Sequence, residues 1–321
     1  MVRSLQLQAD MTQEFGVCVF DVTLDCEDGA PVGGEVEQAN RVAALANSAH
    51  DAPELVARGL SRRVGARLHA VDHASFASDV EIVVGAAAQS LNYVMVPKVE
   101  SLADVELALA ALDAAVRPGQ RATPLPLHVL IESPAAVHRA FEIASHPRVE
   151  SISFGLMDFV SAHGGAIPYS AMGLRNAGDA LTLDQFHHPL VMRAKLDIAS
   201  ACHAFGKVPS HCVVTELRDE DGIERAARTA ASAFGYTRMW SIHPGQIRPI
   251  LRAFMPSRTE LEFAARIVQQ ALCEEWAPIS VDGKLHDRAS YRYFWQVLER
   301  ANQTGCEMPE SMQGYFPARI H

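Results

Sequence analysis

The sequence lacks any run of apolar residues long enough to cross a membrane, and its first residues show no signal-peptide or transit-peptide pattern. We therefore expect a cytoplasmic protein with no membrane partner. Positive charge is also scarce, because 38 acidic residues outnumber 28 Lys and Arg and leave a net charge of −10. This balance argues against a general nucleic-acid-binding protein, although a local group of arginines could still bind a small anionic ligand.

Cysteine motifs are absent as well. The six cysteines include no C-x-x-C pair and have no regular spacing, so neither a zinc site nor a disulfide framework is indicated. Several of them, such as Cys18 and Cys212, lie in apolar segments that read as strands. We predict buried, reduced thiols.

Short apolar runs alternate with amphipathic stretches over most of the chain. Strands are predicted near residues 18–25, 66–71, 92–97, 127–132, 151–155, 208–214 and 238–242. This alternation predicts parallel strands joined by crossover helices, and its natural closed form is a TIM (β/α)8 barrel. We therefore predict an α/β fold with a barrel catalytic domain over residues 1–256.

The strand count leaves the predicted barrel incomplete. A (β/α)8 barrel needs eight strands, one more than the pattern predicts. The simplest interpretation is that a first strand, N-terminal to the helix predicted at residues 2–14, is missing from this chain. The alternative is a barrel that closes in a different way.

Residues 257–321 follow another pattern. A long helix is predicted over residues 261–276, a polar turn over 280–287 and a further helix over 291–301, with no strand among them. We predict a small helical lid or oligomerisation segment, which could fold over a barrel mouth, either its own or a neighbour's.

Two carboxylates, Glu132 and Asp158, each follow an apolar run that is typical of a buried strand. The carboxyl ends of parallel strands are where α/β folds build their sites. Since the two runs fit neighbouring βα units, the carboxylate oxygens could converge on one hard cation. The alternative is a pair of buried or capping acids with ordinary partners.

Seven short motifs extend this pattern over roughly residues 1–300. They are Leu24–Gly29 (LDCEDG), Ala66–His69 (ARLH), Met95–Glu100 (MVPKVE), Ile131–Ser133 (IES), Phe154–Phe159 (FGLMDF), Ser241–Ile247 (SIHPGQI) and Asp282–Asp287 (DGKLHD). In order and spacing they resemble the citrate lyase beta subunit and malyl-CoA lyase family within the HpcH/HpaI aldolase superfamily. His69 stands where that family usually has asparagine, and the family's opening motif R-S-x-L-x-V-P-G has no match here.

The resemblance implies roles for particular residues. Glu132 and Asp158 match the family's Mg2+ ligands, and Mg2+ suits a site with few carboxylates and positions left for water and substrate oxygens. Arg67 matches the arginine that binds substrate and stabilises enolate charge; the alternative is an internal salt bridge to Glu27 or Asp28. Asp287 matches an acid that the family's lid brings to a neighbouring subunit for proton transfer; the alternative is capping of the helix that follows.

Three further residues lie in the same motifs. Glu27 is a candidate catalytic residue and Asp28 a candidate substrate-binding residue, through contacts to Arg67 or to water around the metal. The alternative for both is capping of the next segment. Lys98 is a candidate substrate-binding residue that could neutralise phosphate, and its alternative is an ion pair with Glu100.

The resemblance therefore implies a Mg2+-dependent carbon–carbon lyase. Its substrate would be a 3-hydroxyacyl-CoA ester such as malyl-CoA or citramalyl-CoA, cleaved to an acyl-CoA and a 2-oxo acid, or formed by the reverse condensation. Family members form homotrimers or hexamers, so we expect the same assembly here. The alternatives are a metal-dependent aldolase that acts on a free hydroxy-oxo acid without CoA, and a non-catalytic citrate-lyase-like subunit.

Overall fold

A computed structural model describes residues 1–29, 32–176, 178–179 and 181–316. Its centre is a parallel sheet whose strands follow the chain order. These strands are β1 (Val22–Asp25), β2 (Val64–Arg67), β3 (Tyr93–Val96), β4 (Leu127–Ile131), β5 (Val149–Phe154), β6 (Val208–His211) and β7 (Arg238–Met239). β2, β3 and β4 are buried along their whole length, as expected for parallel strands covered by helices.

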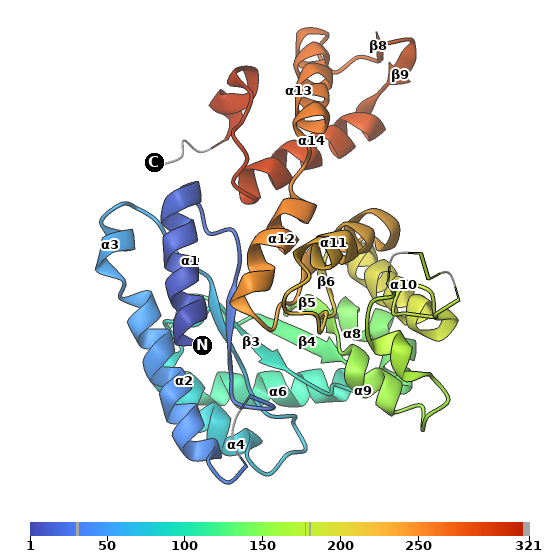
Figure 1. The fold of residues 1–321 in the computed structure, drawn as a ribbon. Helices are drawn as coiled ribbons and strands as arrows, with labels where there is room; N and C mark the ends of the chain where they lie inside the picture. Colours follow the sequence, from blue (N-terminus) through green and yellow to red (C-terminus); the bar gives the residue numbers. More distant parts are fainter. Residues whose placement is uncertain (30–31, 177, 180, 317–321) are drawn as a thin grey trace.

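Helices surround this sheet (Figure 1). They are α1 (Val2–Phe15), α2 (Glu35–His50), α3 (Pro53–Val56), α4 (Phe76–Asp79), α5 (Gly85–Ala87), α6 (Leu102–Ala115), α7 (Pro134–His138), α8 (Ala140–Ser145), α9 (Leu156–Ser161), α10 (Pro189–Ala204), α11 (Glu220–Phe234) and α12 (Pro244–Phe254). A π-helical segment, η1 (Val80–Val84), joins α4 to α5, and η2 (Tyr169–Met172) is a 3-10 turn. Ser101 and Asp104 form a capping box at the start of α6.

Charged side chains hold the sheet in a curled shape. Arg63, just before β2, forms an ion pair of 3.0 Å with Glu150 of β5, on the far side of the sheet. Arg238 of β7 forms one of 3.2 Å with Asp21, which precedes β1. The first and last strands therefore approach one another, although in the described part of the chain they are not hydrogen-bonded to each other. The predicted parallel α/β architecture is confirmed as a curled, seven-stranded sheet.

The segment after α12 forms an arm that stands away from the curled sheet (Figure 1). It contains α13 (Arg258–Cys273), β8 (Ile279–Val281), β9 (Lys284–His286), α14 (Arg288–Gln303) and the 3-10 turn η3 (Glu310–Tyr315). The expectation of no strand here is wrong, because β8 and β9 pair as an antiparallel hairpin. Asp282 and Gly283 have φ values of 51° and 73°, and an Asp-Gly turn with two positive φ angles is a strong hairpin signal.

Two smaller expectations can be compared directly with the structure. All six cysteines are free, and Cys26, Cys202 and Cys212 are buried. No helix among the described residues is both long and apolar enough to cross a membrane.

Candidate functional site

Arg67 is the last residue of β2 and points to acids that follow β1. Its Nε and Nη2 atoms donate to the two carboxylate oxygens of Asp25, at 2.7 and 2.6 Å. Its Nη1 atom lies 2.8 Å from Glu27 and 3.4 Å from Asp28. The indole of Trp240, directly after β7, lies against the guanidinium, with 5.2 Å between the Arg67 Cζ atom and the ring centroid. Burial alone would lower the pKa of Arg67, but these ion pairs raise it, so the side chain is a fixed cation.

The turn after β1 explains why the acids converge on this arginine. Asp25 pairs with Arg67 in the strand register, and its carboxylate also accepts hydrogen bonds from the backbone N–H groups of Glu27 and Gly29. Cys26 is buried beneath the turn, so the residues on either side of it face the carboxyl edge. Both of the interactions suggested for Arg67 with Glu27 and Asp28 are present, whereas Asp25 is the partner that the motif reading did not single out.

Lys98 connects this group to the next strands. Its Nζ lies 2.7 Å from Glu27, so the pair suggested with Glu100 is not formed, and Glu100 instead accepts a hydrogen bond from Ser133. The backbone of Lys98 has a φ of 54°, and its N–H donates to Glu132 at 2.9 Å. This left-handed conformation costs free energy in a non-glycine residue and places one N–H on a buried carboxylate.

Glu132 follows β4 and is only 7% exposed. Its carboxylate lies against Gly155, where an added Cβ would stand 2.3 Å from the Oε1 atom. Burial, followed by the negative charges of Asp158 and Glu27, raises the pKa of Glu132 to about 8. The glycine of the predicted FGLMDF motif is thus required because this carboxylate occupies the space beside it.

Asp158 lies in the first turn of α9, after β5, and is exposed. It is close enough to Glu132 for its charge to affect that carboxyl group. The acids around the site outnumber the cations Arg67 and Lys98; they are Asp25, Glu27, Asp28, Glu132 and Asp158.

This excess of negative charge fits a divalent cation. Within the described ranges, no group of three or more His, Cys, Asp or Glu side chains has a geometry that could hold a metal ion by itself. A site with two carboxylates and the remaining positions open to water or substrate oxygens suits Mg2+, which gives up its water reluctantly. The donor set is therefore compatible with the predicted metal, and poorly suited to zinc or calcium.

Asp287 is not brought to this group within one chain. It is the N-cap of α14 in the arm, and its carboxylate accepts from the backbone N–H groups of Ala289 and Ser290. The capping role considered for it is therefore present. Two arginines before β2 lie away from the carboxyl edge: Arg62 donates to the backbone of Leu5 and Ala49, and Arg63 pairs with acids at the amino-terminal end of the sheet.

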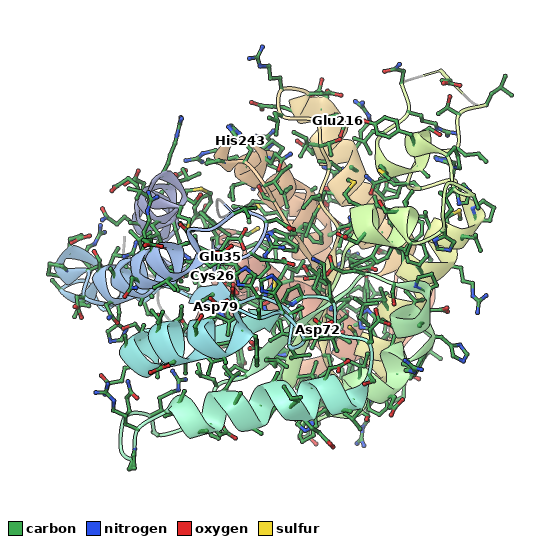
Figure 2. The ribbon with its side chains drawn as sticks, turned by 90° about the horizontal axis from the view of Figure 1, so that it is seen from below. Cys26, Glu35, Asp72, Asp79, Glu216 and His243 are labelled. Atoms are coloured by element: carbon green, nitrogen blue, oxygen red, sulfur yellow. The ribbon has the colours of Figure 1, made fainter. Side chains whose placement is uncertain are left out.

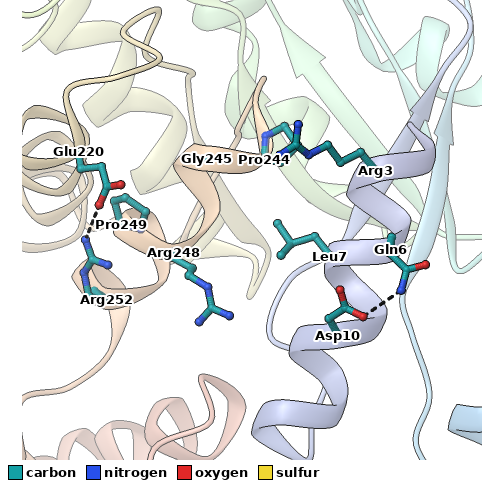
Figure 3. A pocket seen from close by; sticks show the side chains of 10 residues that line it. All are labelled: Arg3, Gln6, Leu7, Asp10, Glu220, Pro244, Gly245, Arg248, Pro249 and Arg252. Carbon is teal, nitrogen blue, oxygen red and sulfur yellow. Dashed lines mark hydrogen bonds and ion pairs between the residues drawn. The ribbon is translucent and has the colours of Figure 1, made fainter.

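A surface pocket lies elsewhere, between α1 and α12 (Figure 3). Its lining includes Arg3, Arg248 and Arg252. Arg248 is paired with Glu14, and Arg252 with Glu220 and Glu224, so two of the three arginines are already neutralised. The carboxylates of the candidate site do not line this pocket.

The comparisons with known proteins agree with this geometry. A family model described as HpcH/HpaI aldolase/citrate lyase matches residues 4–244. The chain belongs to this family. The membership expected from the motifs is therefore confirmed.

Named relatives of this family member are lyases. The chain is 29% identical over 212 residues to an L-malyl-CoA/beta-methylmalyl-CoA lyase of Cereibacter sphaeroides, a match that covers 63% of this chain and 64% of that protein. It is 26% identical over 265 residues to a malyl-CoA/beta-methylmalyl-CoA/citramalyl-CoA lyase of Chloroflexus aurantiacus, covering 78% of this chain and 73% of that one. The chain thus spans less than two thirds of the length of the Cereibacter enzyme.

Solved structures give the same assignment. A citrate lyase from Burkholderia xenovorans is 46% identical, with a TM-score of 0.81 over 99% of this chain and 92% of that chain. The protein CitE of Mycobacterium tuberculosis, solved with magnesium, acetoacetate and coenzyme A, is 25% identical, with a TM-score of 0.64 over 93% of this chain and 95% of that chain.

Proposed function

We propose that this family member is a Mg2+-dependent carbon–carbon lyase that cleaves a 3-hydroxyacyl-CoA ester, such as malyl-CoA or citramalyl-CoA, into an acyl-CoA and a 2-oxo acid. The observation that carries the proposal is the buried carboxylate of Glu132, held against Gly155 and beside Asp158, to which no cationic side chain of the described residues is paired. Magnesium-bound CitE and the malyl-CoA lyases among the relatives support the same assignment.

Glu132 and Asp158 would hold the magnesium ion. When bound, the ion would polarise the oxygens of a 2-oxo acid or its 2-hydroxy precursor. Glu132 is buried and fixed by the N–H of Lys98, whereas Asp158 is exposed and can reach the ion from the solvent side. A bound ion would therefore have one rigid and one accessible ligand.

Arg67 would stabilise the thioester enolate that forms as the carbon–carbon bond breaks. Its guanidinium is oriented by both oxygens of Asp25 and covered by Trp240, so it is already in place before charge develops. In this proposal Glu27, which is buried between Arg67 and Lys98, orients Arg67 or water around the metal. Asp28 and Lys98 bind polar groups of the substrate from more exposed positions.

The arm would act between subunits. In this proposal the seven-stranded sheet is the larger part of a (β/α)8 barrel, and residues 257–321 are a lid. Because the arm stands away from the sheet of its own chain, its Asp287 is free to reach the site of a neighbour in a homotrimer or hexamer (Figure 1). There it would protonate the enolate carbon.

A substrate panel tests this proposal. The purified protein is incubated with Mg2+ and either malyl-CoA, citramalyl-CoA or a free hydroxy-oxo acid, and the acyl-CoA and 2-oxo acid products are measured. We expect cleavage of at least one CoA ester, and loss of at least about 100-fold in Glu132→Gln, the cost typical of removing a metal ligand or catalytic electrostatic group. Glu142→Gln, which changes an exposed glutamate of α8, is the matched control and retains activity.

The same panel separates the alternatives. Cleavage of the free acid without any CoA ester would show an aldolase. No cleavage of any substrate by the metal-loaded protein, or full activity in Glu132→Gln, would contradict the proposed lyase.

A further inference from the structure

Asp79 is an unusual residue for its position. It lies on α4 in line with the buried residues Phe76, Val80 and Val83, on the face that packs into the core. Its side chain is 0% exposed, and its Oδ1 atom has no hydrogen-bond partner in the described part of the chain. A buried carboxyl group is costly unless it is paired, and the paired partner here is His69.

Asp79 and His69 make two close contacts with each other. The Oδ2 atom of Asp79 accepts from the backbone N–H of His69 at 2.9 Å and lies 2.6 Å from its Nδ1 atom. His69 is itself only 6% exposed. The ring of His73 stacks on it with 4.3 Å between ring centroids, and Ser75 holds His73 in place by donating its N–H to the His73 Nδ1 atom.

The helix that carries Asp79 is distorted directly after this residue. Val80–Val84 is π-helical, between α4 and α5. A π-bulge inserts a residue into a helix and turns the preceding side chains, and such bulges are frequent at functional sites. The distortion and the buried acid thus occur together, and Asp79 lies near Cys26, the residue directly after β1 (Figure 2).

His69 and Asp79 lie where the backbone hydrogen bonds between β2 and its two neighbouring strands end. The carbonyl of Arg67 accepts from Cys26 of the first strand's turn, and the N–H of Leu68 donates to Met95 of β3. The next N–H, that of His69, donates to the side chain of Asp79. The side chain of Asp79 therefore supplies the next hydrogen-bond acceptor after those of the strands, and it holds the backbone two residues beyond Arg67.

We infer that His69 and Asp79 are a positioning pair for Arg67, an inference that rests on the role proposed for Arg67 above. Asp25 and Glu27 orient the guanidinium from the side of β1, and the His69–Asp79 pair holds the strand end from which Arg67 extends. Neither residue touches the reacting atoms. Small displacements of an aligned group slow catalysis strongly, so the pair should matter for turnover while leaving the magnesium ligands on β4 and α9 undisturbed.

A double substitution separates positioning from simple packing. His69→Leu combined with Asp79→Leu replaces both side chains of the buried polar pair, so that neither is left without the other, although the backbone N–H of His69 loses its acceptor. We expect the double variant to fold with a melting temperature lowered by this one unpaired N–H and with wild-type magnesium affinity, but with kcat/KM reduced about 10- to 100-fold. Wild-type kcat/KM in this variant would overturn the inference.

Conservative rescue gives a second comparison. In His69→Asn the amide nitrogen can replace Nδ1 as the donor to Asp79. His69→Leu removes this donor and leaves the buried carboxyl group of Asp79 without its side-chain partner. We expect His69→Asn to keep kcat/KM within about threefold of wild type and His69→Leu to lose it, as is typical when an outer hydrogen bond is removed. Equal activities in these two single variants would contradict the pair's role even if the double variant fails to fold.

Amide hydrogen exchange makes the test independent of turnover. Residues 64–76 should exchange faster in the double variant than in wild type, because the N–H of His69 loses its acceptor. Unchanged exchange there would overturn the inference. If wild type cleaves no substrate, the proposed function fails, and exchange together with calorimetric binding of pyruvate to the magnesium-loaded protein still decides whether the pair orders the Arg67 segment.

Discussion

Both carboxylate oxygens of Asp25 are hydrogen-bonded to the guanidinium of Arg67, at 2.7 and 2.6 Å. Two parallel bonds between a planar cation and a planar anion set orientation as well as distance. The direction of the arginine is therefore decided by a residue on the neighbouring strand, and the site depends on the register between β1 and β2.

Asp25→Asn should weaken this orientation without removing the side chain. An amide can accept only one of the two bonds, so we expect kcat/KM to fall about 10- to 100-fold, with magnesium affinity unchanged. Steady-state kinetics and magnesium titration check this. Asp21→Asn is the matched control, since Asp21 also pairs with arginines, Arg63 and Arg238, but at the opposite end of the sheet. An equal loss of turnover in both variants would show that general stability, and not orientation, is affected.

Gly155→Ala should displace the carboxylate of Glu132. The new Cβ would stand 2.3 Å from Oε1, while the backbone φ of −90° suits alanine. We expect magnesium affinity to fall about 10-fold or more, as when the support of a metal ligand is lost. Gly85→Ala, where an added Cβ meets nothing within 4 Å, is the control and should be neutral or stabilising by about 0.5–1 kcal/mol. Unaltered magnesium binding in Gly155→Ala would contradict the geometry.

The stability of the metal-free protein should fall as pH rises. Burial and the charges of Asp158 and Glu27 raise the pKa of Glu132 from 4.5 to about 8, so between these values the native state keeps a proton that the unfolded state has lost. The expected loss across this window is on the order of 3 kcal/mol, reduced by any residual solvent contact. Urea unfolding in EDTA at several pH values measures it. Glu132→Gln should flatten the dependence, and identical slopes for both proteins would rule out the assignment to Glu132.

Two substitutions of Asp287 distinguish its role as a helix cap from a role in proton transfer. Asparagine caps helices about as well as aspartate, so Asp287→Asn should keep the stability of the arm, whereas Asp287→Ala should cost about 1 kcal/mol. If Asp287 also transfers a proton, both variants lose exchange of the acetyl-carbon proton of acetyl-CoA with solvent deuterium, followed by NMR. Exchange at the wild-type rate in Asp287→Asn would leave Asp287 as a helix cap alone.

Much of the fold could be read from local patterns. The alternation of apolar runs and helices predicted every strand of the large sheet, although β2 is displaced toward the amino terminus and ends at Arg67 instead of near Val71. That end is set by the side chain of Asp79 in the next helix, which accepts the N–H of His69, and the apolar pattern of the strand does not record this contact. The hairpin β8–β9 was missed although the Asp282-Gly283 turn was visible, because its strands are only three residues long.

The site could be predicted only in part for the same reason. Residues at strand ends, such as Glu132 and Arg67, follow from the position of each strand in the sequence. Partners that come from other strands do not, which is why Asp25 and Trp240 were not identified as contacts of Arg67. A tryptophan directly before the SIHPGQI motif was the one available signal for the second of these.

Calorimetric titration of Mg2+ into the metal-free protein tests the central claim most directly. The account predicts one binding site in wild type and in Glu142→Gln, and at least about tenfold weaker binding in Glu132→Gln and in Asp158→Asn. Binding of equal strength in all four proteins would contradict the claim that Glu132 and Asp158 hold the metal.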